Sequence, residues 1–526
     1  MTEKKKRWLV IAVLIAMFLF GCCFVRETGV YFDERSEQEI LYMNILQYSD
    51  VFHINRISGV LRNRGIIPIC ESVERDHGIA THYLCAPILM LLEGRADLQS
   101  TAWHMYTYIL FFMGVVYMYR LLGEVFQSKR TALAGAMILF FSPKIFGDGL
   151  YNNKDCVLLS MVIIMLFYGV CFIEKRDFRS AVLLGISAGF ACNLKISGIY
   201  VLALIGAYYL ICLTVKKQWN RRHFLVGVTA AGTAFLCYLI LTPAIWGQGF
   251  QLIRFIQWNL SNVTKFSRID GTVLFEGKMY RHSVNPLPWY YLPKIIVLTI
   301  PVYVSVMIAA GAVLWGKYRR RWGTAGQFYP LFVLIPVIPL AVAMAGNPNI
   351  YNGWRHFYFV YGSMIVLSSY TVHYMIHVTK YKKVSTAVLS LCIAIQVAGI
   401  SENGSASAAY MNRLAGGDAG GRYELDYYGV TAKRILMSLV DSYGDICVKS
   451  DSKGAVIVNR EALPSNYRDK ITLVYTDEDI EQAKKDGQTV LGFINTSYDG
   501  TDGITNENEC WDWKAWDNTY VKIRVY

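Results

Sequence analysis

The sequence predicts an α-helical polytopic membrane protein that carries a small external α/β domain at its C-terminal end. Hydrophobic residues make up 54% of the 526 residues, and charged residues only 17%, whereas about a quarter of the residues of a soluble domain are charged. Several apolar runs approach or exceed the ~18 residues that cross a bilayer. Only the last quarter of the chain returns to a composition typical of a soluble domain.

Eleven apolar segments are candidate membrane spans. The first could instead be a signal peptide, because a Lys-rich start precedes its apolar run. That run continues past Cys22 and many spans follow, which favours an uncleaved first span. The least certain two are 180–193 and 196–214, because only the short break NLKIS separates them. The eleven segments are 8–25, 101–122, 131–147, 156–173, 180–193, 196–214, 224–246, 294–315, 328–346, 357–378 and 384–400.

The positive charges of the loops predict the orientation. With the Lys-rich N-terminus in the cytoplasm, every dense cluster of Lys and Arg falls on the same side, as the positive-inside rule requires. Merging the two segments around NLKIS would break this alternation. The sequence therefore predicts a multi-pass protein of the cell membrane with a cytoplasmic N-terminus and an external C-terminal domain. The clusters lie at 129–130, 175–179, 216–222, 317–321 and 380–383.

Two domains are predicted: a membrane domain at 1–400 and an external α/β domain at 401–526. In the first external loop, 26–100, the apolar stretch 79–94 is too short to span comfortably and predicts an interfacial helix. The stretch SENGSASAAY, 401–410, is predicted to be a linker. Strands are expected at 455–459, 471–476, 489–495 and 520–526, and a helix with acidic residues at its start is expected at 477–487.

The net charge of +13 does not indicate a nucleic-acid-binding protein. The cations lie in short loops between apolar spans, and the soluble part has no basic stripe with interleaved aromatic residues. Most of the twelve cysteines lie inside apolar runs, and no pair has the spacing of metal ligands. Cys447 and Cys510 both fall in the soluble part, where a disulfide between them depends on their geometry.

The charged residues of the external loops gather at the outer ends of spans. Because these ends reach the same face of the membrane, the sequence predicts that the side chains share one cavity there. The residues are Asp33 and Glu34 after the first span, Lys144, Asp148, Lys154 and Asp155 in SPKIFGDGLYNNKD (142–155), and Arg355 and His356 in NPNIYNGWRHFYFVYG (347–362).

Carboxylates beside cations in a site of low dielectric suit the transfer of a group from an anionic leaving group. One carboxylate accepts the proton of an incoming hydroxyl, and the cations hold the phosphate that departs. A phosphate leaving group needs no second acid as proton donor, unlike the leaving group of a glycosidase. Asp33, Asp148 and Asp155 also offer hard oxygen ligands, so a divalent cation, Mg²⁺ or Mn²⁺, stays an open alternative.

Four stretches in chain order resemble the polytopic GT-C glycosyltransferases: YFDE after the first span, SPKIFGDGLYNNKD after the third, GWRHFYFVYG at the tenth, and YELDYYG at 423–429. The sequence is most similar to bacterial relatives of the dolichyl-phosphate-mannose-protein mannosyltransferases, the glycosyltransferase 39 type, over most of residues 1–430. This resemblance implies a GT-C-like fold, a polyprenyl-phosphate sugar as lipid-linked donor, and transfer on the external face with inversion at the sugar.

The resemblance also implies roles for the charged residues. Asp33 matches the catalytic base, and Glu34 the second acid of the pair. Asp148 and Asp155 match a second acidic site. The contacts to the lipid phosphate are expected from Lys154, Arg355, His356 and Lys144.

The acceptor stays open between a protein, a lipid and a cell-wall glycan. Two other functions are alternatives to the enzyme. A multi-span transporter would carry its charges near the middle of the bilayer on broken or repeated helices, whereas here they cluster at span ends. A membrane-anchored structural or sensory protein would tolerate loss of Asp33 but not of the C-terminal domain.

Overall fold

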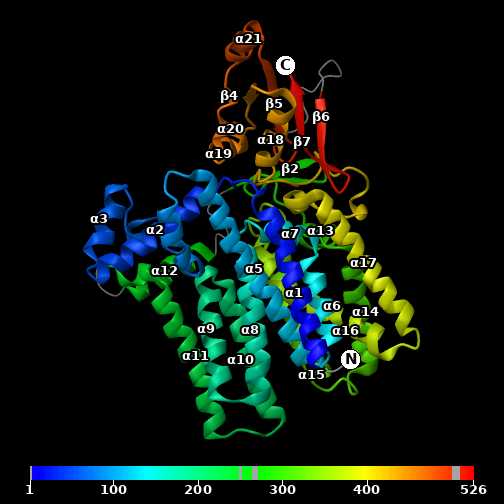
Figure 1. Cartoon of the computed structure of the whole chain (residues 1–526). Helices are drawn as coiled ribbons and strands as arrows, with labels where there is room; N and C mark the ends of the chain where they lie inside the picture. The colour runs from blue at the N-terminus through cyan, green and yellow to red at the C-terminus, as the bar shows by residue number, and fades with distance from the viewer. Residues whose placement is uncertain (1–2, 248–250, 264–269, 500–509) are drawn as a thin grey trace.

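The computed structural model describes residues 3–247, 251–263, 270–499 and 510–526. Figure 1 shows a bundle of helices with the C-terminal α/β domain seated on one end of it, next to a lateral layer of shorter helices. The segment between the predicted spans 224–246 and 294–315 lies partly outside the described residues, at 248–250 and 264–269.

Seven helices of the described residues are long and apolar enough to cross a membrane. An eighth span results if a pair of helices bent by 114° is counted as one. The seven are α1 (Glu3–Val25), α5 (Ala96–Phe126), α8 (Asp155–Lys175), α10 (Ser197–Val215), α11 (Arg221–Leu241), α15 (Gly323–Gly346) and α17 (Lys382–Asn403), and the bent pair is α13 (Tyr291–Thr299) with α14 (Val302–Tyr318).

Each of the eleven predicted spans coincides with helical structure, which confirms the helical membrane fold class. Only seven or eight of these helical segments are long and apolar enough to cross a membrane, rather than about eleven, because the remaining segments form shorter helices. Proline explains two of the breaks, since it lacks the backbone N–H that would continue a helix: Pro301 lies at the bend of the pair, and Pro143 separates two short helices. The shorter helices are α6 (Lys129–Phe140), α7 (Pro143–Gly149), α9 (Phe178–Leu194) and α16 (Tyr361–His373).

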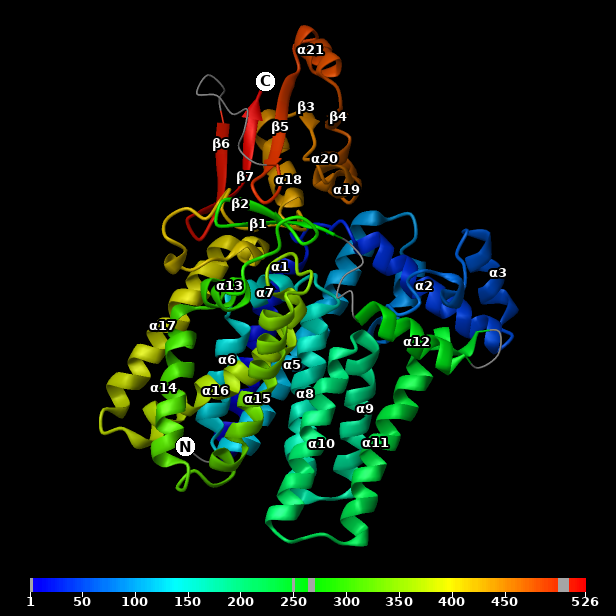
Figure 2. The same ribbon diagram turned by 180° about the vertical axis from the view of Figure 1, so that it is seen from behind.

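Helix α8 forms the centre of the bundle. Of its apolar window 94% is buried inside the protein, a larger share than for any other candidate span of the described residues. It packs against α5 and α9. Its N-terminal end, which begins with Asp155, points towards the end of the bundle that carries the C-terminal domain (Figures 1 and 2).

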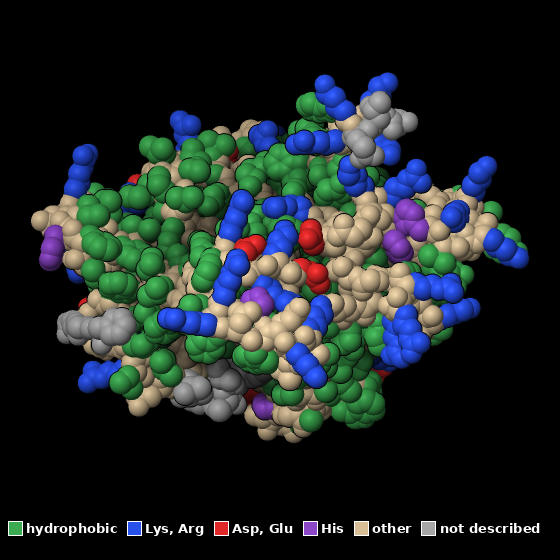
Figure 3. Space-filling model, turned by 90° about the horizontal axis from the view of Figure 1, so that it is seen from below, with side chains coloured by type: hydrophobic (Ala, Val, Ile, Leu, Met, Phe, Trp, Pro, Cys, Tyr) green, Lys and Arg blue, Asp and Glu red, His purple; other side chains and the backbone are tan. Residues whose placement is uncertain are grey.

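The cation-rich loops gather at the opposite end of the bundle. The helices α8 to α11 run alternately away from and towards the C-terminal domain, so the loops 175–179 and 216–222 reach the far end (Figure 2). Figure 3 views the molecule from that side and shows Lys and Arg side chains spread over it. The predicted alternation of the loops agrees with this arrangement.

The segment between α1 and α5 forms a lateral layer at the C-terminal-domain end. It contains α2 (Glu34–Val51) and α3 (Asn55–Asn63), and the predicted interfacial helix is divided into a 3₁₀ turn, Ala80–Cys85, and α4 (Ala86–Leu91). Helix α12 (Leu252–Val263) lies beneath this layer, and the hairpin of β1 (Thr272–Phe275) and β2 (Lys278–Arg281) lies under the C-terminal domain (Figure 2).

The C-terminal domain has a five-stranded sheet in the order β4-β3-β5-β7-β6. Strand β3 is parallel to β4 and β5, and β7 is antiparallel to β5 and β6. Its elements are α18 (Ala432–Tyr443), β3 (Ile446–Lys449), α19 (Ala455–Glu461), α20 (Ser465–Arg468), β4 (Ile471–Val474), α21 (Asp477–Lys485), β5 (Thr489–Asn495), β6 (Cys510–Ala515) and β7 (Asn518–Val525).

Three details of the predicted domain are wrong. The stretch 455–459 forms the start of α19 rather than a strand, because its buried residues follow a helical pattern. The stretch predicted as a linker ends α17 and then forms a buried 3₁₀ turn, Gly404–Ala409, packed on α7. Small residues allow that close approach: a Cβ on Gly147 would lie 2.2 Å from the backbone nitrogen of Ala408.

The third detail is the disulfide. Cys447 and Cys510 are both free. They lie on β3 and β6, which β5 and β7 separate. Three strand spacings amount to about 14 Å, and a disulfide needs Cα atoms closer than about 7 Å.

Candidate functional site

The candidate site begins where the chain leaves α1. The connecting segment is fixed by the C-terminal domain: Gly29 donates its N–H to the carbonyl of Val430 at 2.8 Å. The N–H of Val30 binds the side-chain oxygen of Asn459 at 2.8 Å, and the amide group of Asn459 donates to the carbonyl of Val30 at 2.9 Å. Asp33, directly before α2, is therefore held at the junction of the two domains.

The carboxylate of Asp33 is free for a ligand. It does not cap α2, and it accepts no hydrogen bond from the residues that the structure describes. Desolvation by the surrounding protein raises the pKa of Asp33, while Arg355 and Lys154 oppose this rise and Glu37 adds to it. The chain next to Asp33 contacts both segments: Tyr31 donates to Asn153 and Glu37 binds Lys154. The ring of Tyr428 lies 5.1 Å from that of Phe32 and 5.3 Å from the guanidinium of Arg355.

The two acids after Asp33 have different surroundings. Glu34 is 2% exposed and its carboxylate lies 2.8 Å from Nε2 of the fully buried His104. Glu37 follows Asp33 by four residues and therefore lies on the same helix face. It accepts hydrogen bonds from Lys154 at 3.2 Å and from Asn153 at 3.4 Å. The acid that shares the space around Asp33 is Glu37, and Glu34 is turned into the protein.

We expect Glu34 to stabilise the fold rather than to take part in the reaction. Replacing it by alanine leaves the buried imidazole of His104 without its partner, which costs about 1–3 kcal/mol. The loss is measured as a lower midpoint of thermal unfolding in detergent, with Glu34→Gln recovering part of it. A Glu34→Ala variant with full stability but no activity would contradict this expectation.

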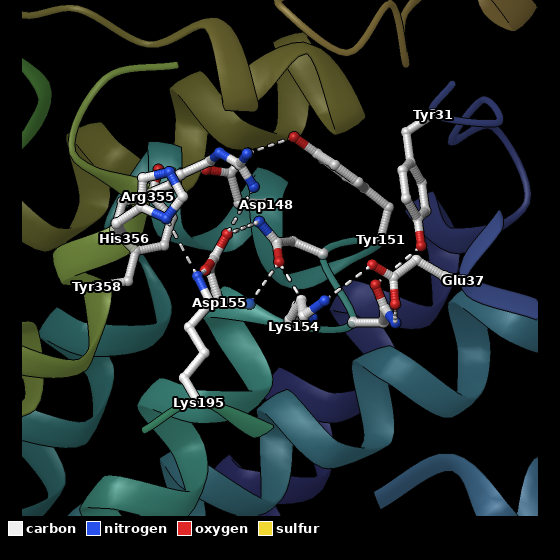
Figure 4. A network of polar contacts seen from close by, with 12 residues as sticks. Tyr31, Glu37, Asp148, Tyr151, Lys154, Asp155, Lys195, Arg355, His356 and Tyr358 are labelled. Carbon is white, nitrogen blue, oxygen red and sulfur yellow. Dashed lines mark hydrogen bonds and ion pairs between the residues drawn. The ribbon is translucent and has the colours of Figure 1, made fainter. Parts of the chain in front are cut away.

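The loop between α7 and α8 positions several polar groups (Figure 4). The side-chain oxygen of Asn152 accepts from the backbone N–H groups of Lys154 and Asp155, at 3.2 and 2.7 Å, and so caps α8. The oxygen of Asn153 accepts from the hydroxyl of Tyr31 at 2.8 Å. These bonds direct Lys154 towards Glu37 and Asp155 towards the opposite side of the site.

Asp155 forms the centre of a buried ion cluster. It is ion-paired with Lys195 and, at 3.2 Å, with Arg355. The ammonium of Lys195 also lies 3.3 Å from Nδ1 of His356. Figure 4 shows that Arg355 and His356 enter from the 3₁₀ turn Arg355–Val360, while Lys195 reaches up from the break between α9 and α10.

Two donors of this cluster have no partner among the described residues: Nε of Arg355 and Nε2 of His356. Because Nδ1 of His356 accepts from the ammonium of Lys195, its hydrogen is carried by Nε2. Burial and the nearby cations Lys195 and Arg355 lower the pKa of His356, so the ring is neutral. Buried polar groups are normally hydrogen-bonded, so these two N–H groups need an acceptor that the described residues do not supply.

Asp148 and Lys144 lie in a separate, fully buried group. Asp148 accepts hydrogen bonds from the hydroxyls of Tyr151 and Tyr358. Lys144 donates to the carbonyl of Ala408 at 2.8 Å and lies 3.9 Å from Asp148. The geometry therefore engages Lys144 with the protein itself, whereas Lys154 and Arg355 act on Asp33 and His356 lies beside Lys195.

The carboxylates do not form a suitable metal site. Asp155 is neutralised by two cations, and both oxygens of Asp148 are bound by tyrosines. Within the described ranges, no group of three or more His, Cys, Asp or Glu side chains could hold a metal ion. This donor set does not fit Mg²⁺ or Mn²⁺, which need several free oxygen ligands.

The YELDYYG stretch closes the site from the side of the C-terminal domain. Asp426 accepts from the N–H groups of Val430 and Thr431, and so fixes the turn. Gly429 has a φ of 66°, a left-handed conformation that glycine adopts without strain. The turn places the ring of Tyr428 5.3 Å from the guanidinium of Arg355. Burial raises the pKa of the nearby Glu424 to about 7.

A small pocket lies beside the site, between α2, α9, α11 and α12. Its polar side contains Arg75 and His77, and its other walls include Tyr238 and Phe255. His77 acts electrostatically on both Asp33 and Glu37. The pocket is therefore next to the acids, on the side of the lateral layer.

Comparison with known proteins assigns the enzyme class. Residues 76–246, about a third of the chain, match the family model described as dolichyl-phosphate-mannose-protein mannosyltransferase. This range contains the 148–155 segment and Lys195. The protein is a glycosyltransferase. The resemblance stated from the motifs is confirmed, and the transporter and structural alternatives are not supported.

Solved structures of other glycosyltransferases share a weak likeness to this one. An oligosaccharyltransferase from Archaeoglobus fulgidus has 12% identity and a TM-score of 0.49, over 94% of this chain and 70% of its own. ArnT from Cupriavidus metallidurans, bound to undecaprenyl phosphate, has 11% identity and a TM-score of 0.46, over 100% and 98%. The mycobacterial arabinofuranosyltransferase AftD has 9% identity and a TM-score of 0.44, over 99% and 40%. No curated protein matches the chain.

Several residues of the candidate site were absent from the sequence prediction. Glu37 follows Asp33 by four residues, a spacing that places both on one helix face once a helix is expected to begin there. Lys195 is the only charged residue in the NLKIS break and could have been noticed as a lysine at the outer end of two apolar segments. Tyr358 and Tyr428 give no such signal, because aromatic residues are frequent in membrane proteins.

The pH dependence of the glycosyltransferase tests the role of the Glu37–Lys154 pair. If Asp33 must be ionised, activity falls as the pH drops through its raised pKa. Glu37→Gln removes a negative neighbour and frees Lys154, so the pKa of Asp33 falls and the acid limb of kcat/KM moves to lower pH. Lys154→Met has the opposite effect, and the limb moves to higher pH.

The control for this pair is Arg62→Gln, which breaks an exposed ion pair with Asp50 at the far end of α2. Its profile should equal that of the unmodified enzyme, because solvent screens such a pair. If the acid limbs of kcat/KM moved in the same direction for Glu37→Gln and Lys154→Met, this arrangement of Glu37 and Lys154 around Asp33 would be wrong.

Proposed function

We propose that the enzyme transfers a sugar from a polyprenyl-phosphate donor to an acceptor hydroxyl, with inversion at the sugar and with Asp33 as the base. The observation that carries this proposal is the free carboxylate of Asp33 opposite a group of cations. Lys154 and Arg355 both act on its pKa, and they come from the loop before α8 and the 3₁₀ turn before α16.

The reaction is a single displacement. The acceptor oxygen attacks the anomeric carbon as its proton passes to Asp33, and the bond from that carbon to the phosphate oxygen breaks. The electron pair of this bond stays on the phosphate, so the leaving group needs no proton. Attack opposite the leaving group inverts the configuration at the anomeric carbon.

The cationic side of the site supports a phosphate leaving group. Lys154 and Arg355 supply positive charge, and the unpartnered Nε of Arg355 and Nε2 of His356 supply hydrogen bonds. Asp155 and Lys195 hold Arg355 and His356 in place. In this proposal Lys144 supports the fold of the loop, and Glu37 orients Lys154.

The family name specifies a lipid-linked sugar, a dolichyl-phosphate mannose, as the donor of its members. We propose the same donor class for this chain. The pocket formed in part by Arg75, His77 and Phe255 lies beside the acids, on the side of the lateral layer. The proposed membrane orientation puts the cation-rich end in the cytoplasm and the site, with the C-terminal domain, outside.

The test is incubation of the purified, full-length enzyme with a panel of polyprenyl-phosphate sugars. We expect consumption of at least one donor and release of the polyprenyl phosphate. NMR of the transferred sugar should show the anomeric configuration opposite to that of the donor. Retained configuration, or turnover only of nucleotide sugars, would refute the proposal.

A further inference from the structure

A lysine of the C-terminal domain lies against the site. Lys453 belongs to the loop between β3 and α19, at the end of a parallel strand where α/β sheets usually bind their ligands. Its ammonium lies 3.6 Å from the ring centre of Tyr427, 4.5 Å from that of Tyr498 and 5.4 Å from that of Phe32. Phe32 directly precedes Asp33, so Lys453 is next to the proposed base.

The ammonium has free hydrogen-bonding capacity. Within the described parts of the chain it donates no hydrogen bond and forms no close ion pair, and its nearest contacts are the three aromatic rings. The rings of Phe32, Tyr427 and Tyr498 are half-buried, so each keeps an accessible edge or face. An ammonium has three donors, and the structure leaves all three available to a ligand.

Carboxylates gather around Lys453. Four carboxylates act on it electrostatically: Glu424, Asp33, Asp451 and Asp499. Asp451 is bound by the hydroxyl of Tyr498, and Asp499 by the backbone N–H groups of Ser452 and Asn495. These four carboxylates outnumber the ammonium of Lys453, which disfavours a phosphate at this position and favours a neutral ligand with several hydroxyls.

We propose that Lys453, Phe32, Tyr427 and Tyr498 bind the acceptor, and that this acceptor is a neutral sugar. This inference rests on the proposed function. A sugar ring places its polarised C–H groups on aromatic faces, and its hydroxyl oxygens accept from the ammonium of Lys453. The C-terminal domain thereby supplies a positioning residue that brings the acceptor hydroxyl to Asp33, and the lipid donor approaches from the cationic side.

The variant Lys453→Met keeps the length and apolar stem of the side chain and removes the charge. Loss of hydrogen bonds from a charged donor should raise the acceptor KM about ten- to hundredfold, with a smaller change in kcat. Lys453→Arg should recover part of the affinity. The matched control is Lys449→Met, four residues earlier, whose ammonium pairs with Asp477 and should leave the kinetics unchanged.

A binding measurement separates this inference from the proposed reaction. Saturation-transfer NMR on the full-length enzyme would use lactose, cellobiose and maltose as neutral probes and glucose 6-phosphate as an anionic one. We expect neutral probes to bind the unmodified and Lys449→Met enzymes and to bind Lys453→Met several-fold less, with thermal unfolding confirming that each variant is folded. Equal binding by Lys453→Met, or preference for the sugar phosphate, would overturn the inference. Binding of neutral sugars without any donor turnover would instead overturn the proposed reaction alone.

Discussion

Asp33→Asn is expected to reduce sugar transfer by about a hundred- to ten-thousandfold, the usual contribution of a general base. The amide has the same size as the carboxylate but cannot take up the proton of the acceptor hydroxyl. Because no described residue donates a hydrogen bond to the carboxylate, the substitution removes no native contact. Thermal unfolding should therefore be nearly unchanged.

The matched control is Asp50→Asn, at the other end of α2, where the carboxylate forms an exposed ion pair with Arg62 at 2.7 Å. It changes the same group on the same helix and should retain full transfer. The measurement is the initial rate of polyprenyl phosphate release at saturating donor. An Asp33→Asn enzyme that keeps full activity would remove Asp33 from the mechanism.

Asp155→Asn is expected to lower the free energy of unfolding by about 3–5 kcal/mol, the typical cost of breaking a buried ion pair. Asp155 is 1% exposed, and its loss leaves Lys195 and Arg355, with side chains 22% and 10% exposed, without a counter-charge. The partial exposure of Lys195 places the expected loss towards the lower end of this range. The midpoint of thermal unfolding in detergent measures it.

Asp148→Asn provides the comparison for Asp155. Asp148 is also buried, with its side chain 6% exposed, but its two oxygens accept from tyrosine hydroxyls and its lysine is 3.9 Å away. An amide oxygen can still accept from one of these hydroxyls, so we expect a smaller loss than for Asp155→Asn. If the two variants lost similar amounts of unfolding free energy, the charges of Lys195 and Arg355 would not be the main reason why Asp155 stabilises the protein.

The structure differs from the sequence-based prediction of the site mainly in which charged residues pair with one another. The sequence placed Asp33 beside Glu34 because they are adjacent, but on a helix adjacent residues point in different directions and residues four apart share a face. Glu37 therefore faces Lys154, and Glu34 faces His104. Lys144 was expected beside the phosphate because it lies in the same motif as Lys154, and packing of α7 against the 404–409 turn directs it elsewhere.

The sequence by itself determined the positions of the apolar helices and the gathering of cations at one end of the bundle, because hydrophobicity and charge act locally along the chain. It also offered Asp33 as the candidate base. Only the tertiary structure decided which charges meet. Lys154 and Glu37 are 117 positions apart, and Asp155 and Arg355 are 200 apart, so their pairing depends on how α2, α8 and the 355–360 turn pack. The same applies to Lys453, which reaches Phe32 only because the C-terminal domain is seated on the end of the bundle.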